Sequence, residues 1–163
     1  DSAYTTRFGG GRVTRSDVLH AVAGNPAATI VGELAGTSLP ADAFDCIILT
    51  QTLPFIYDVR SAVAGCRRAL KPGGVVLATV PGISQISRYD MDRWGDFWRF
   101  TTLSAQRLFA DAFGAANVQA ASCGNVLAAT AFLQGLAWEE LKKEELDFND
   151  PDYQLVVTIR AVK

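Results

Sequence analysis

The sequence has 163 residues, enough for one domain with a buried core, and 49% of them are hydrophobic. The formal net charge of −2 gives no electrostatic reason to expect nucleic acid or an anionic membrane as a partner, because both bind basic surfaces. Neither an apolar run of membrane-spanning length nor a charged leader before an apolar stretch occurs. We therefore expect a globular domain with no nucleic acid and no membrane among its partners.

The three cysteines, Cys46, Cys66 and Cys123, are widely spaced and form no CxxC pair of the kind found in zinc or redox sites. Cys46 lies in an apolar run and Cys66 on the apolar side of an expected helix. Both are therefore predicted to be small buried hydrophobic side chains. Free thiols suit a reducing compartment, so the expected location is cytoplasmic.

Short segments rich in β-branched residues alternate with helical segments along the chain. The first two are Arg12–Leu19 and Ala28–Leu34, each bounded by glycine-containing turns. Phe44–Thr50 and Val75–Val80 are nearly continuous apolar runs that are too short for helices. Such runs are typical of interior strands in a parallel sheet that helices cover on both faces.

A helix is predicted between these two runs, because apolar residues recur three and four positions apart from Ile56 to Leu70. The helix ends at Lys71-Pro72-Gly73-Gly74, where proline cannot continue it and glycine permits a left-handed exit. Strand, helix and strand then form one right-handed crossover unit.

The second half of the sequence predicts a helix that Ser104 caps and that runs to about Phe113. The remaining elements are a strand over Asn117–Cys123, helices over Asn125–Gln134 and Ala137–Leu146, and a final strand over Tyr153–Val162. A strand that follows helices so late in a parallel α/β unit often inserts antiparallel. The whole chain, residues 1–163, is predicted to be a single α/β domain.

Signatures of several other enzyme classes are missing. A single histidine, His20, and the lack of HExxH or calcium-loop spacing argue against a metal site. No GxSxG nucleophile elbow and no GxxxxGK[ST] phosphate loop occur. Gly9-Gly10-Gly11 does not extend to GxGxxG, because Thr14 stands at the last glycine's position, and it precedes a predicted strand instead of following one.

Polar residues follow two of the predicted strands where each strand ends. Glu33 closes the second strand, and Thr50-Gln51-Thr52-Leu53 lies at the end of the third. Ligands of open α/β sheets bind outside the carboxyl ends of the strands, so these residues are expected to share one rim. A carboxylate buried there needs a partner, which a hydroxyl or amine of a bound nucleoside supplies.

The pattern E-L-x(4)-L-P-x(3)-F-D-C-I-I-L from Glu33, followed by R-R-A-L-K-P-G-G-V-V-L from Arg67, resembles the class I methyltransferases that use S-adenosylmethionine, in particular the type 11-like domain. The resemblance covers Arg12 to Phe113 by motif and the remainder by element order. It implies a Rossmann-like three-layer αβα sandwich with a mostly parallel sheet and a late antiparallel strand. The implied cofactor is S-adenosylmethionine, and the implied reaction is methyl transfer to a small-molecule acceptor.

The resemblance also implies roles for single residues. Asp17 would bind the ribose hydroxyls, although the nearby His20 competes for that role. Glu33 would lie by the adenine amino group with Leu34 as its apolar contact. Thr50, Gln51 and Thr52 would face the methionine portion of the cofactor. Taken without the resemblance, Asp17 could instead cap a helix from Val18, and Gln51 and Thr52 could merely close a turn.

The acceptor side is predicted from the aromatic stretch Arg93–Thr101. Trp94, Trp98 and Arg99 are the candidate substrate contacts, because two large rings beside a guanidinium form an apolar wall with charge-assisted donors. The alternative is that Phe97 and Phe100 belong to the core and Trp94 covers an edge. The catalytic base is unassigned; the polar candidates near the rim are Tyr89, Asp90 and Asp96.

The family's first strand and glycine-rich loop have no counterpart here, and the sequence opens at Asp1 with no Met. A sheet without that strand would expose unpaired edges, and a homodimer is one way to cover them. Two alternatives to an active methyltransferase stay open at this point. One is a methyltransferase-like module that binds a partner without catalysis, and the other is a nicotinamide-dependent oxidoreductase, which the missing GxGxxG disfavours.

Overall fold

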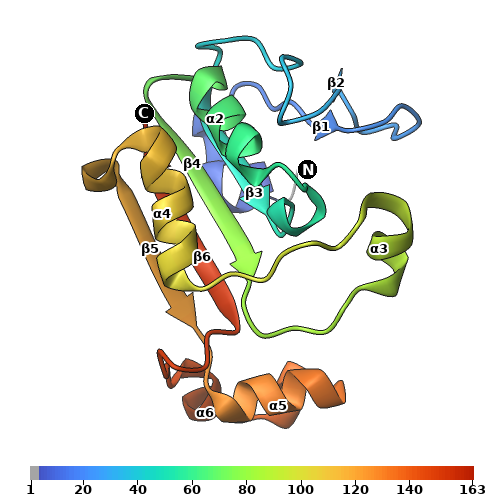
Figure 1. The fold of residues 1–163 in the computed structure, drawn as a ribbon, viewed down its shortest axis with the longest axis vertical. Coiled ribbons are helices and arrows are strands. Elements are labelled where there is room, and N and C mark those ends of the chain that lie inside the picture. Colours follow the sequence, from blue (N-terminus) through green and yellow to red (C-terminus); the bar gives the residue numbers. More distant parts are fainter. Residues whose placement is uncertain (1–3) are drawn as a thin grey trace.

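The computed structural model describes residues 4–163. Its centre is a four-stranded sheet in the order β3-β4-β6-β5. The strands are β3 (Phe44–Thr50), β4 (Leu70–Pro81), β5 (Val118–Cys123) and β6 (Val156–Val162). β3 and β4 pair in parallel, whereas β6 runs antiparallel to both β4 and β5 (Figure 1). The predicted mostly parallel sheet with a late antiparallel strand is confirmed.

Two helices, α2 (Val59–Ala69) and α4 (Thr102–Phe113), lie on the same face of this sheet (Figure 1). The hydrophobic core lies between these helices and the buried side chains of β4 and β6. Because strand residues alternate between the two faces, Ile48 of β3 and Leu77 of β4 point to the opposite face, where each is 44% exposed.

The environments of two cysteines differ with their positions in the fold. Cys66 is buried in α2, as predicted, and burial raises the pKa of its thiol to about 12. The prediction that Cys46 is buried is wrong. Cys46 shares a strand face with Ile48, away from α2 and α4, and its side chain is exposed.

The two helices begin at capped residues near their predicted starts. Asp58 caps α2 by accepting a hydrogen bond from the Ser61 backbone nitrogen at 3.0 Å, so the helix begins after Asp58 and not at Ile56. The prediction that Ser104 caps α4 is wrong by one turn. Thr101 is the cap, and Ser104 completes a reciprocal capping box with it.

The predicted first two strands are reduced to β1 (Leu19–His20) and β2 (Ile30–Val31), which pair in parallel with each other in a separate small sheet. At the boundaries of these two strands, side-chain hydroxyls accept hydrogen bonds from backbone nitrogens. The Val18 nitrogen donates to Thr29 Oγ1 at 2.8 Å, and the Glu33 nitrogen donates to the hydroxyl of Ser38 at 3.2 Å. Such bonds compete with a strand ladder, which explains why these strands are shorter than predicted.

Residues 124–155, here called the arm, connect β5 to β6 and lie beyond the carboxyl ends of β4 and β5 (Figure 1). The arm holds α5 (Val126–Gln134) and α6 (Lys143–Asp147), with a 3₁₀ turn over Trp138–Glu140, so the single helix predicted over 137–146 is interrupted. The buried Asn125 ties the arm together. Its side-chain oxygen accepts a hydrogen bond from the Ala128 nitrogen and so caps α5. Its side-chain nitrogen donates to the backbone carbonyls of Glu145 and Phe148, each at 2.7 Å.

Gly65 of α2 lies directly against the backbone of the segment after β2. A Cβ atom at position 65 would lie 2.2 Å from the carbonyl oxygen of Leu34. Gly→Ala within a helix ordinarily stabilises a protein by up to about 1 kcal/mol. Here the clash is with backbone, and overpacking of this kind costs about 1–3 kcal/mol.

Gly65→Ala is therefore expected to lower the free energy of unfolding by about 1–2 kcal/mol, measured by urea denaturation. Ala64→Ser, at the exposed neighbouring position, is the control and should change stability by less than about 0.5 kcal/mol. A more stable Gly65→Ala protein would show that the segment at Leu34 is free to move away from α2.

Candidate functional site

Three of the predicted cofactor residues lie together where β3 ends. Gln51 has a φ of 51°, in the left-handed region that non-glycine residues rarely adopt. Its backbone nitrogen donates to the Thr79 carbonyl at 2.9 Å, and its side-chain Nε2 donates to Thr79 Oγ1 at 3.3 Å. Thr52 donates to the Thr50 carbonyl at 3.1 Å. These bonds close a turn and also hold Thr50, Gln51 and Thr52 at the rim. The geometry therefore suits the predicted contact with the methionine portion of the cofactor as well as the alternative of a simple turn.

Asp17 lies just before β1 with its carboxylate already engaged. Arg15 forms an ion pair with it at 2.9 Å, and the Thr29 hydroxyl donates to Oδ1 at 3.1 Å. The hydrogen bond from Arg15 is the main reason that the pKa of Asp17 lies below its ordinary value. The alternative that Asp17 caps a helix is wrong, because Val18 leads into strand β1. Its contact with a ribose stays a prediction.

Glu33 and Leu34 follow β2 but have opposite environments. The side chain of Glu33 is exposed, so the expectation of a buried carboxylate is wrong, and its carboxylate is accessible to a ligand. Leu34 is 7% exposed and belongs to the hydrophobic core, with its carbonyl against Gly65 of α2. The predicted contacts of both residues with adenine stay predictions.

The predicted acceptor segment leaves the sheet after β4, forms α3 (Arg88–Trp94) and returns to α4. At the end of α3, the ring of Trp94 meets the imidazole of His20 edge-on, with the ring centres 5.7 Å apart. The Phe97 nitrogen then donates to the Pro54 carbonyl at 2.9 Å. The segment therefore contacts both the end of β1 and the turn that follows β3.

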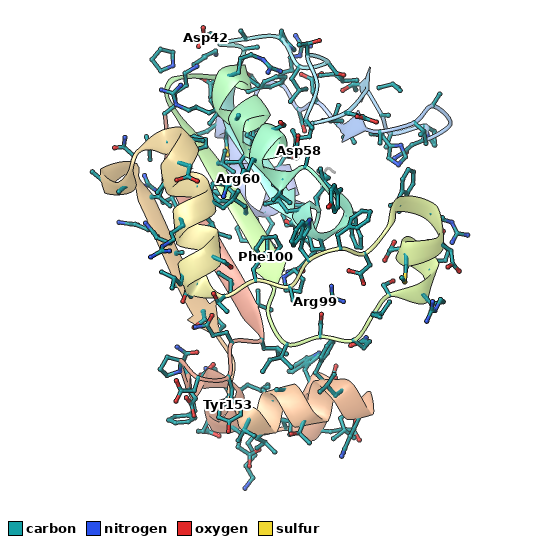
Figure 2. All side chains as sticks on the ribbon, viewed as in Figure 1. Asp42, Asp58, Arg60, Arg99, Phe100 and Tyr153 are labelled. Carbon is teal, nitrogen blue, oxygen red and sulfur yellow. The ribbon has the colours of Figure 1, made fainter. Side chains whose placement is uncertain are left out.

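Phe97 and Phe100 differ in burial. Phe100 is buried in the core, and its nitrogen donates to the Pro81 carbonyl at the end of β4 at 2.8 Å. Phe97 remains exposed, so the alternative that both rings are core residues holds for Phe100 alone. Figure 2 labels Phe100 beside Arg99, where the segment between α3 and α4 turns back toward the sheet.

Arg99, a predicted substrate contact, uses all of its N–H groups within the protein. Two go to the carboxylate oxygens of Asp96 at 2.5 and 2.9 Å. The other three go to the backbone carbonyls of Ser84, Gln85 and Trp98, at 3.4, 2.7 and 2.9 Å. Since a guanidinium has five N–H donors, none remains for a ligand in this conformation. Arg99 joins the two ends of the acceptor segment, and we interpret it as a positioning residue.

Asp96 is equally committed. Its side chain is 3% exposed and also accepts a hydrogen bond from the Ser87 nitrogen at 3.2 Å. The hydrogen bonds from Arg99 hold the pKa of Asp96 below its ordinary value, outweighing burial, which raises it. A carboxylate that is stabilised as an anion accepts a proton poorly, so Asp96 does not suit the role of a general base near neutral pH.

The other two polar candidates lie on α3. Asp90 accepts a hydrogen bond from the Ser87 hydroxyl at 2.6 Å, at the start of the helix. The exposed Tyr89 ring lies under the Arg93 guanidinium, 3.5 Å from it. Neither contact places the side chain beside the ends of β1 or β3, and the catalytic base remains unassigned.

Tyr57 was missed in the sequence and lies at the centre of an aromatic cluster. Its ring stacks on that of Trp98, with ring centres 5.9 Å apart, and meets Phe97 edge-on at 5.4 Å. Trp98 and Phe97 come from the acceptor segment, whereas Tyr57 comes from the entry to α2. No local pattern marks Tyr57, because its partners are about forty residues away; the only available signal was an aromatic residue just after a strand-end turn.

Within residues 4–163, no helix combines the length and apolar character needed to cross a bilayer. The same residues contain no cluster of three or more His, Cys, Asp or Glu side chains arranged to hold a metal ion.

Residues 4–78 match the model of a family described as a methyltransferase domain. No curated protein matches the chain. Solved structures with a similar fold include a S-adenosylmethionine-dependent methyltransferase of Thermotoga maritima, at 16% identity and a TM-score of 0.55, over 84% of this chain and 65% of that one. They also include a Haloferax volcanii complex between the Trm112 methyltransferase activator and a methyltransferase, at 14% identity and a TM-score of 0.60, over 98% of this chain and 76% of that one.

A third similar structure is phosphoethanolamine N-methyltransferase 2 of Haemonchus contortus, in complex with phosphomonomethylethanolamine and S-adenosylhomocysteine. It shares 15% identity with this chain at a TM-score of 0.52, over 82% of this chain and 36% of that one. The chain thus spans 65% of the length of the Thermotoga protein and 36% of that of the Haemonchus protein. At these identities the similarity shows the fold, and it confirms the Rossmann-like αβα class.

The pair between Asp96 and Arg99 generates a pH-dependent prediction. The native pKa of Asp96 lies below the unfolded value of about 3.9, so the pair stabilises the protein above that pH. This stability is lost as the pH falls through the native pKa. At pH 7, Asp96→Asn should lower the free energy of unfolding by about 1–2 kcal/mol, because a partly exposed charge-assisted pair is replaced by a neutral one.

The measurement is urea denaturation of both proteins at pH 7 and near pH 3, where the difference between them should shrink. Asp92→Asn, at an exposed acidic residue on α3 four positions before Asp96, is the matched control and should behave like the unmodified protein. A difference between the unmodified protein and Asp96→Asn that does not change with pH would contradict the ion-pair explanation.

Proposed function

The chain carries a class I S-adenosylmethionine-dependent methyltransferase domain, and from this we propose that it transfers a methyl group to a small-molecule acceptor. The observation that carries the proposal is the strained Gln51 turn at the carboxyl end of β3, which leads into the turn at Pro54 that binds the aromatic acceptor segment. Strained backbone of this kind concentrates at ligand sites.

The residues proposed to hold the cofactor have suitable chemistry. The exposed carboxylate of Glu33 can accept hydrogen bonds from the adenine amino group, and Asp17 from ribose hydroxyls. Thr50, Gln51 and Thr52 offer hydroxyl and amide groups for the methionine portion. When bound, the cofactor supplies a sulfonium methyl group, whose C–S bond breaks as the bond to the acceptor nucleophile forms, with the acceptor's proton passing to solvent.

On the acceptor side, Trp94 and Trp98 are proposed to contact the substrate, and Arg99 to act through the segment that it braces. Trp94 is held near β1 by its contact with His20. Trp98 is held near β3, because its indole N–H donates to the Ile56 carbonyl at 3.1 Å. Methyl transfer requires in-line approach of the acceptor, so fixed walls of this kind contribute to the rate by positioning.

The proposal predicts that the chain binds S-adenosylhomocysteine and that Glu33→Ala weakens this binding by about 1–3 kcal/mol, the value of a hydrogen bond to a charged group. Isothermal titration calorimetry measures both. Glu144→Ala, an exposed acidic residue on α6, is the control and should bind like the unmodified chain.

NAD titrated in the same way should give no binding heat. Unchanged affinity of the Glu33→Ala protein would remove Glu33 from the site. Binding of NAD in place of S-adenosylhomocysteine would instead favour a nicotinamide-dependent oxidoreductase, and binding of neither would favour a module without catalysis.

A further inference from the structure

We propose that Tyr57, Phe97 and Trp98, here called the aromatic corner, bind a flat, uncharged aromatic group of the acceptor. This inference rests on the proposed methyltransferase function and specifies the class of its substrate. It also adds two residues, Tyr57 and Phe97, to the acceptor site.

The geometry of the aromatic corner leaves room for another ring. Trp98 stacks on Tyr57 with an angle of 29° between the ring planes, and Phe97 meets Tyr57 at 72°. Despite these two contacts, Tyr57 is 72% exposed. Tyr57 therefore remains accessible to a planar group, and aromatic rings favour offset-stacked or edge-on contacts of this kind.

Hydrogen bonds hold the indole of Trp98 and the backbone of Phe97 in place. Trp98 donates its indole N–H to the Ile56 carbonyl, and the backbone nitrogen of Phe97 donates to the Pro54 carbonyl. Pro54 is fully buried and belongs to the turn that follows β3, so these bonds connect the corner to the sheet. A surface that is ordered before binding loses little conformational entropy when a ligand arrives.

Both carboxylates near the aromatic corner already accept hydrogen bonds within the protein. The carboxylate of Asp96 is neutralised by both ends of the Arg99 guanidinium. The carboxylate of Asp58 faces the first turn of α2, where it accepts from the Ser61 nitrogen. Asp96 is therefore charge-compensated, whereas Asp58 keeps its charge and faces the helix start. The surface that the three aromatic residues share is made of ring faces, and a flat uncharged group can stack on these without a counter-charge.

The position of the aromatic corner suits an acceptor. Tyr57 follows the turn Leu53–Phe55, which itself follows the Thr50–Thr52 rim where the methionine portion is proposed to lie. A flat group stacked on the corner would therefore lie next to that rim, with its substituents free to point toward the methyl donor.

The test uses three probes on the whole chain: 1-naphthol, its saturated analogue decahydro-1-naphthol, and tetramethylammonium. Binding is followed by the NMR signal of the Trp98 indole N–H, assigned with Trp98→Phe. We expect 1-naphthol to shift this signal in a saturable way and the other two probes to bind at least about fivefold more weakly. Equal binding of the saturated analogue, or tighter binding of tetramethylammonium, would overturn the proposal, and neither comparison depends on a variant.

Variants then locate the site. Tyr57→Leu should weaken 1-naphthol binding about fivefold, whereas Tyr57→Phe, which keeps the ring, should remain within about twofold. Trp138→Leu is the control, since Trp138 is a 71% exposed aromatic residue on the arm. Equal effects of Tyr57→Leu and Trp138→Leu would show general hydrophobic association and contradict the proposal.

Calorimetry with S-adenosylhomocysteine separates this inference from the proposed function. If S-adenosylhomocysteine binds but 1-naphthol does not, the methyltransferase function stands and the substrate class is wrong. If 1-naphthol binds at Tyr57 but S-adenosylhomocysteine does not bind, the aromatic corner is a ligand site and the proposed function fails.

Discussion

The arrangement of the rim depends on residues at the end of β4 and just after it, which bond to three of the segments that gather there. Thr79 accepts the hydrogen bonds that hold Gln51 at the end of β3. Pro81 accepts from the nitrogen of Phe100, where the aromatic segment returns, and Gly82 donates to Leu155 at the end of the arm. β4 is itself fixed on both edges, in parallel with β3 and antiparallel to β6. A slip of one residue would turn its buried side chains to the other face, so the register that preserves the core also sets the rim.

The ion pair between Asp96 and Arg99 organises the acceptor side in a different way. It is formed within one loop, and two further donors of Arg99 bind the carbonyls of Ser84 and Gln85 near the start of that loop. The loop is thus closed on itself, while the bonds to Pro54 and Pro81 attach it to the sheet. Phe97 and Trp98 belong to the part of the loop that is held both by the Arg99 bonds and by the bonds to Pro54 and Pro81. For this reason their rings keep a defined orientation although the segment is irregular.

Apolar runs and periodicity predicted β3, α2, β6 and the Val75–Val80 part of β4. The antiparallel direction of β6 followed from its late place in the order of elements. Other features depend on partners that no local pattern reveals. The hydroxyls of Thr29 and Ser38 accept backbone hydrogen bonds where the first strands were predicted to continue, and backbone carbonyls accept the hydrogen bonds of Arg99 that Asp96 does not. The candidate rim at Thr50–Thr52 could be found from strand ends, but Tyr57 acquires its place only when a segment forty residues later folds over it.

The arm has its own small interior. Ala128, Ala129 and Ala131 are buried, yet they lie outside the main hydrophobic cluster, and Asn125 holds the two helices of the arm to each other. Opening of α5 and α6 can leave the bonds that Gln154 and Leu155 make to the rest of the domain intact, so the local stability of these two helices is set separately from that of the sheet. The amides of α5 should therefore exchange hydrogen through partial openings, while those of β4 wait for the whole domain to unfold.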